Sequence, residues 1–95
     1  MTAPYGVRIT SAARRQLRRL PSKVATAVVE FLTVVLPENP MRLSKPLTGE
    51  LTGLRSARRG DYRVLIDVDE VDRQILVVRL AHRSDAYRPP PPGTD

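Results

Sequence analysis

The chain has 95 residues, enough for one domain with one layer of helices on one sheet. It has no cysteine and a single histidine, His82, so disulfides and thiolate metal sites are excluded, and we expect no metal and no cofactor. Its net charge of +6 favours a polyanionic partner, bound through phosphate neutralisation, although a solvated basic face is the alternative.

The N-terminal segment lacks the marks of a secretion signal. Met1–Thr10 has neither a charged start nor an apolar centre. The most apolar run, Val24–Leu36, is interrupted by polar residues and is far shorter than the roughly 20 residues of a membrane helix. We therefore expect a soluble, cytoplasmic protein that contacts no membrane.

The first third of the chain predicts a strand followed by two helices. Tyr5–Thr10 alternates like a short strand, and Thr10 or Ser11 can cap the helix that follows. The apolar face of that helix has helical spacing: Ala13, Leu17 and Leu20. Pro21 ends it, and a second helix is predicted over Lys23–Leu36, so that the two form a helical hairpin.

The second helix has an unusually broad apolar face. Its central stripe contains Val24, Val28, Phe31 and Val35, and this stripe is widened by Ala25, Leu32 and Leu36. Such breadth predicts burial on more than one side, with one side against the sheet and the other against the first helix or a partner. Pro37, Asn39 and Pro40 end the helix.

The rest of the chain changes from a helical period to a period of two. Met41–Gly53 is predicted as a loop, punctuated by proline and glycine. The elements expected after it are a strand at Leu54–Arg58, a turn at Arg59–Asp61, a strand at Tyr62–Val68, a turn at Asp69–Asp72 and a strand at Gln74–Ala81.

The resulting order, β-α-α-β-β-β, predicts an α+β domain over residues 1–88. It consists of an N-terminal strand, a helical hairpin and a three-stranded antiparallel meander. One face of the meander binds the helices and the other carries basic residues. Residues 89–95, which begin with four prolines, are expected to form an extended, poorly ordered tail.

Two arginines of the C-terminal half stand out. Arg63 projects from the face opposite Tyr62 and Val64, an odd place for a cation in so apolar a strand unless that face is open. Arg83 follows the last strand, so the two can converge if the hairpins pair in sequence. The alternative is structural: either arginine can form a salt bridge, for example with Asp85.

These residues belong to a pattern that resembles the RelE/ParE toxins of type II toxin–antitoxin systems, and the RelE branch in particular. The pattern covers nearly the whole chain and consists of Lys45-Pro46-Leu47, Gly53-Leu54, Arg58, Gly60-Asp61-Tyr62-Arg63-Val64, His82-Arg83 and Tyr87. The resemblance implies a metal-independent endoribonuclease that cleaves mRNA in the ribosomal A site. It also implies a cognate RelB-like antitoxin, expected to be small, acidic and partly disordered.

The resemblance also implies roles for individual residues. Arg63 matches the arginine that clamps the scissile phosphate, and Arg83 the one near the leaving group, as clamp or proton donor. Tyr87 matches a tyrosine that orients or stacks on the nucleotide, although it can instead cover the core. Arg58 matches a basic residue of the second strand. These four are the expected catalytic residues, together with His82.

The sequence departs from the family at Leu54 and Ser56, where ribosome-dependent members commonly have lysine or arginine. This leaves the general base unidentified. His82 could fill the gap, because its unperturbed pKa is near 6.5, or it could be a hydrogen-bonded residue at a strand end.

The remaining cations are expected to contact the ribosome or mRNA, with a plain solvated face as the alternative. They are Lys45, Arg55, Arg59, Arg14, Arg15, Arg18 and Arg19. Two rival functions stay open: a ParE-like inhibitor of DNA gyrase that has no nuclease activity, and a nucleic-acid-binding module without activity.

Overall fold

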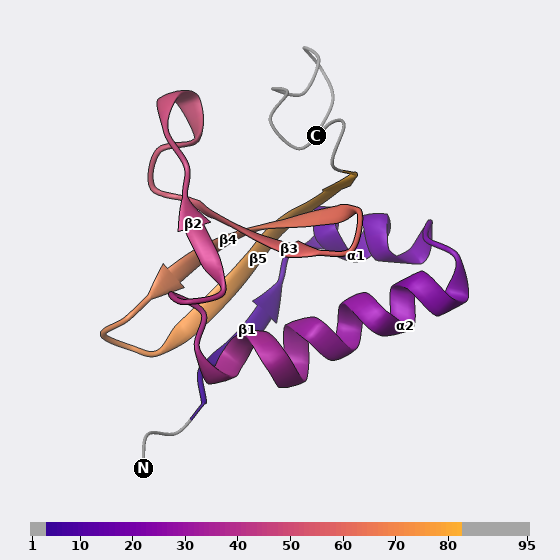
Figure 1. The fold of residues 1–95 in the computed structure, drawn as a ribbon, viewed down its shortest axis with the longest axis horizontal. Coiled ribbons are helices and arrows are strands. Elements are labelled where there is room, and N and C mark those ends of the chain that lie inside the picture. The colour runs from indigo at the N-terminus through magenta and orange to yellow at the C-terminus, as the bar shows by residue number, and fades with distance from the viewer. Residues whose placement is uncertain (1–3, 83–95) are drawn as a thin grey trace.

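The computed structural model describes residues 4–82 of the chain (Figure 1). Arg83, Tyr87 and the expected tail over residues 89–95 lie outside the described residues. The elements in chain order are β1 (Gly6–Ile9), α1 (Ser11–Arg18), α2 (Ser22–Glu30), η1 (Phe31–Val35), η2 (Leu36–Glu38), β2 (Ser44–Pro46), η3 (Gly49–Leu51), β3 (Arg55–Arg59), β4 (Tyr62–Asp69) and β5 (Gln74–His82). Within residues 4–82, no helix is long and apolar enough to span a membrane.

The strands form one five-stranded sheet with the order β1-β5-β4-β3-β2. β1 runs parallel to β5, and every other pair is antiparallel. The predicted α+β class, helical hairpin and β3-β4-β5 meander are confirmed. The prediction had one strand too few, because β2 lies in the segment expected to be a loop. With three residues at the edge of the sheet, β2 is too short to show a period of two.

Thr10 connects β1 to α1 and fixes both. Its hydroxyl accepts a hydrogen bond from the backbone N–H of Ala13 (3.1 Å), which is the predicted helix cap. The same hydroxyl donates to the carbonyl of Val78 on β5 (2.7 Å). From α1, the side chain of Gln16 accepts a bond from the N–H of Leu80 (2.7 Å), so α1 is tied to the sheet beyond the end of β1.

The second helix does not stay α-helical over its whole predicted length. It changes at Phe31 into a π-helical turn, η1, and then into the short 3₁₀ turn η2. A π turn has more residues per turn than an α-helix, so it rotates the residues that follow it. Leu36 is therefore fully buried, whereas Val35 is 43% exposed. Val35 therefore does not share the buried face of Val28 and Phe31, with which the predicted stripe grouped it.

Both helices cover the same face of the sheet, which gives a two-layer domain (Figure 1). The core between the layers contains Ala13, Val28, Phe31, Leu32, Leu36, Ala57, Val64, Ile66, Ile75, Val77 and Leu80. No helix of residues 4–82 packs on the opposite face, which is called the open face below.

Candidate functional site

The open face gathers basic side chains from neighbouring strands. Residues paired directly across neighbouring strands share a face, so the pairing register assigns this surface. Around Arg63, the open-face residues of β2 to β5 are Lys45, Ser56, Arg58, Arg63, Leu65, Arg79 and Ala81. Four of these seven are cations. We call Lys45, Arg58, Arg63 and Arg79 the cation cluster.

Arg58 and Arg63 lie directly opposite each other at the centre of the cation cluster. Like charges at directly opposed positions of a sheet repel each other, so an anion that contacts both side chains would be attracted to this place. Arg58 is also anchored to its own turn, because its Nε donates to the carbonyl of Gly60 (3.2 Å). Gly60 has a φ of +62°, which a glycine adopts without strain. The turn therefore holds the side chain of Arg58 close to its own backbone, beside Arg63.

Arg79 belongs to the cation cluster only because β5 is irregular. Simple alternation from Ile75 and Val77 would point Arg79 into the core. The β4–β5 register shifts between Leu65 and Ile66, so that Arg79 pairs with Leu65 on the open face. The shift leaves one extra residue, Val78, on β5, whose carbonyl accepts the hydroxyl of Thr10. Sequence reasoning missed Arg79, since a bulge leaves no mark in the alternation of side chains.

Lys45 joins the cation cluster from the edge strand β2, which Arg55 holds in place. The Arg55 guanidinium donates through Nε to Ser44 Oγ (2.8 Å) and through Nη2 to the carbonyls of Ser44 (3.0 Å) and Met41 (3.1 Å). Three of its five N–H groups are thus used inside the molecule. Arg55 also pairs with Ile66, which places it on the face opposite Lys45. Arg55 therefore has a structural role, which is to hold β2 in place.

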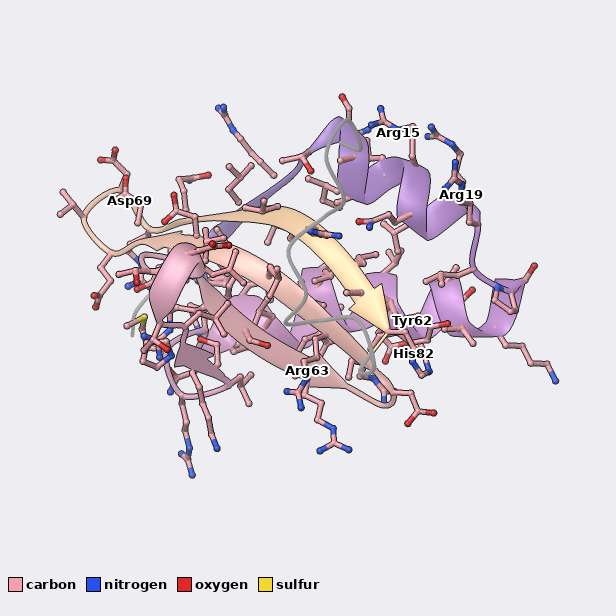
Figure 2. The ribbon with its side chains drawn as sticks, turned by 90° about the horizontal axis from the view of Figure 1, so that it is seen from above. Arg15, Arg19, Tyr62, Arg63, Asp69 and His82 are labelled. Atoms are coloured by element: carbon pink, nitrogen blue, oxygen red, sulfur yellow. The ribbon has the colours of Figure 1, made fainter. Side chains whose placement is uncertain are left out.

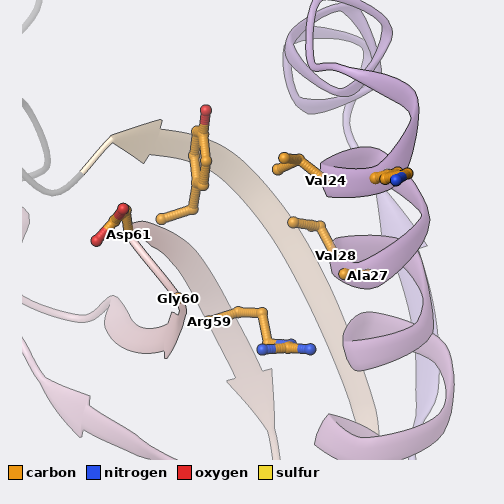
Figure 3. A pocket seen from close by; sticks show the side chains of 8 residues that line it. Val24, Ala27, Val28, Arg59, Gly60 and Asp61 are labelled. Carbon is orange, nitrogen blue, oxygen red and sulfur yellow. The ribbon is translucent and has the colours of Figure 1, made fainter.

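Arg59 and His82 lie on the helix side of the sheet, opposite Arg63. Both are paired with Tyr62, and the rings of Tyr62 and His82 meet edge to face with centroids 5.5 Å apart (Figure 2). Arg59 reaches toward α2 and lines a pocket of about 280 Å³ with Val24 and Val28 (Figure 3). The pairing thus places the side chain of His82 on the face of the sheet opposite Arg63, and its role as a general base stays a prediction.

The four arginines of α1 form a second basic surface. Arg14, Arg15, Arg18 and Arg19 are all exposed, and Arg14 Nε donates to the carbonyl of Ile9 (3.3 Å). Figure 2 shows Arg15 and Arg19 on α1, well away from Arg63. The structure brings together Lys45, Arg58 and Arg63 of the expected site. It does not bring the α1 arginines to the cation cluster.

The fold and this surface define a class: a small basic α+β domain that carries cations on the face of its sheet opposite the two helices. Residues 7–87 match the model of a family described as the ParE toxin of type II toxin–antitoxin system, parDE. Toxin RelE of Mycobacterium tuberculosis is 51% identical over 85 residues, covering 90% of this chain and 88% of that protein. Toxin RelG of the same organism is 47% identical, covering 90% and 98%.

A solved structure agrees with these relatives. One chain of the toxin–antitoxin complex RelBE2 from Mycobacterium tuberculosis superposes with a TM-score of 0.81 at 46% identity, covering 85% of this chain and all of that one. The protein therefore belongs to the ParE toxin family of type II toxin–antitoxin systems, and its similarity to RelE and RelG confirms the resemblance noted from the sequence.

Proposed function

We propose that this toxin is a cytoplasmic, metal-independent endoribonuclease that cleaves mRNA in the ribosomal A site and so inhibits translation. The observation that carries the proposal is the opposed pair Arg58 and Arg63 on the open face, with Lys45 and Arg79 beside it. A guanidinium is planar, permanently charged and able to bind phosphate through two hydrogen bonds. An RNA phosphate that contacts both arginines would be attracted by both charges.

The reaction that suits this surface needs no cofactor. The 2′-hydroxyl of the substrate gives up its proton and attacks the adjacent phosphorus, the bond to the 5′-oxygen breaks, the departing 5′-oxygen takes up a proton, and a 2′,3′-cyclic phosphate remains. The phosphorus passes through a state with added negative charge, which fixed cations stabilise. In this proposal Arg63 clamps the scissile phosphate and Arg58 supports it. The resemblance adds Arg83 at the leaving group and Tyr87 on the nucleotide.

The ribosome supplies the second part of the proposed interaction. The exposed arginines of α1 and the cations near the cation cluster would neutralise phosphates of ribosomal RNA or mRNA. Arg59 is exposed and can take part from the hairpin turn. Arg55 contributes indirectly, because most of its donors bind Ser44 and Met41.

We further propose a RelB-like antitoxin as the partner. The RelBE2 structure is described as a toxin–antitoxin complex, and its matching chain is 46% identical to this one. An acidic antitoxin would complement the basic surface, and the exposed apolar strip of Val29, Val34 and Val35 offers it a docking site. Val35→Asp should then weaken binding of the antitoxin chain of RelBE2, measured by calorimetry. Unchanged affinity in a folded variant would contradict this site.

A gyrase inhibitor is the second candidate, favoured by the family model itself, which describes a ParE toxin, and by the uncharged residues at Leu54 and Ser56. One experiment separates the two. A translating extract receives the purified protein and a defined message, and primer extension maps the 5′ ends, with supercoiling of relaxed plasmid by gyrase assayed in parallel. Cuts in phase with the codons are expected. Intact message together with blocked supercoiling would establish the gyrase inhibitor instead.

A further inference from the structure

Ser56 is a buried serine at the centre of a basic surface. Its side chain is 7% exposed, and its Oγ has no hydrogen-bond partner within residues 4–82. It pairs with Lys45 on one side and with Leu65 on the other. A serine here carries no charge, whereas the family resemblance noted from the sequence implies a cation at this position. The open face therefore has a gap in its charge between β2 and β4.

Lys45 is placed to fill this gap. Side chains directly opposite each other in an antiparallel pair have Cβ atoms about 4.5–5.5 Å apart. The four-carbon stem of lysine covers that distance, so its ammonium can stand over Ser56, where a lysine at position 56 would put its own. Arg58 and Arg63 follow two residues further along the strands, about 7 Å away.

The backbone that carries Lys45 is fixed, although β2 has only three residues. Ser44 is buried and is held by Arg55 and by a hydrogen bond from its own Oγ to the carbonyl of Pro40 (2.6 Å). Pro46, on the other side of Lys45, has a ring-restricted φ. Beyond it the N–H of Leu47 donates to the carbonyl of Leu54 (2.9 Å). An exposed lysine is thus presented from a rigid edge.

We propose that Lys45 is a catalytic residue whose ammonium contacts the scissile phosphate and replaces the cation missing at Ser56. This assignment rests on the ribonuclease function proposed above. The ammonium would stabilise the negative charge that develops on the phosphate oxygens while Arg63 holds the same group. No proton transfer is required of it.

The test measures single-turnover cleavage of message on purified programmed ribosomes. Lys45→Ala should lower the rate about 10²-fold, the usual effect of losing one charge-stabilising donor. The matched control is Lys23→Ala, because Lys23 is the only other lysine of the chain and lies exposed on α2. It should cleave at the wild-type rate. The double variant Lys45→Ala/Ser56→Lys should recover most of the lost rate, since it delivers an ammonium to the same place from β3.

Each result decides the assignment. Wild-type protein that leaves the message intact would overturn the ribonuclease proposal and the role of Lys45 with it. Cleavage by Lys45→Ala at the wild-type rate would overturn the role of Lys45 alone. A double variant as slow as Lys45→Ala would show that an ammonium over Ser56 does not act on the phosphate, which also overturns it. If the variants and the wild type have equal melting temperatures, the differences in cleavage rate come from the reaction and not from unfolding.

Discussion

The two faces of the sheet are made from the same strands, but different interactions govern the side chains on each. On the helix side, Val64, Ile66, Ile75 and Val77 are fully buried and their positions follow from side-chain packing. On the open face, the pairing of β3 with β4 sets two cations, Arg58 and Arg63, directly opposite each other, an arrangement that a sheet does not favour by itself. Departures from such local rules are expected at functional sites. The open face is therefore where function is to be sought.

The largest effect should come from the open face. Arg63→Ala removes the guanidinium proposed to clamp the phosphate, and mRNA cleavage should fall by about 10²–10⁴-fold because charge stabilisation is lost in the transition state. Quantitative primer extension on programmed ribosomes measures it. Arg8→Ala is the control, because Arg8 is exposed on β1, two strands away in the same sheet. If Arg63→Ala cleaves as fast as wild type, the open face is not the active surface.

The helix side should respond in stability instead. Leu36 is fully buried after the π turn, so Leu36→Ala should lower the free energy of unfolding by about 2–5 kcal/mol. Its neighbour Val35 is 43% exposed, and Val35→Ala should change that free energy by no more than about 0.5 kcal/mol. Urea denaturation measures both. Comparable losses, or a larger loss at Val35, would mean that the helix continues without the π turn.

Leu36 and Val35 show how much of the structure can be predicted from the sequence. Hydrophobic spacing predicted the hairpin and the meander, and residue type predicted a cap at Thr10 or Ser11, because each follows from a local pattern. Spacing put Val35 in one stripe with Val28 and Phe31, since an extra residue per turn in η1 has no signature in the sequence. It missed β2, which depends on Arg55 from β3 for its position. Such features arise from contacts between distant residues, and single-chain periodicity does not contain them.

In the candidate site, too, local patterns predict some residues, whereas others depend on contacts between strands. The family motif pointed to both Arg58 and Arg63, whereas strand parity pointed to Arg63 alone. His82 was considered as a replacement for the missing cations, and its pairing with Tyr62 puts it on the face opposite Arg63. Parity holds along a regular strand, but the extra residue Val78 within β5 reverses it for the residues that follow. The convergence of Arg63 with Arg83 and Tyr87 stays a prediction, since the last two lie outside the described residues.

A smaller effect on stability is expected where α1 joins the sheet. Thr10→Ala removes the cap of α1 and the donor to the Val78 carbonyl, so the free energy of unfolding should fall by about 1–2 kcal/mol. Thermal or urea denaturation measures the loss. Thr26→Ala, at an exposed position of α2, serves as the control and should leave stability within about 0.5 kcal/mol. Equal effects of the two substitutions would mean that Thr10 does not hold the junction.

The smallest effect tests the bulge that turns Arg79 outward. If Arg79 lies on the open face, it neutralises one RNA phosphate, and Arg79→Ala should reduce the slope of log K against log salt concentration by about 0.7 for single-stranded RNA. Fluorescence anisotropy at several salt concentrations measures the slope. Lys23→Ala removes the same charge from the helix layer and should leave it unchanged. Regular alternation would instead bury Arg79 among Ile75 and Val77. Arg79→Ala would then change the free energy of unfolding and leave the salt slope as it was. The bulge predicts a smaller slope and an unchanged free energy of unfolding.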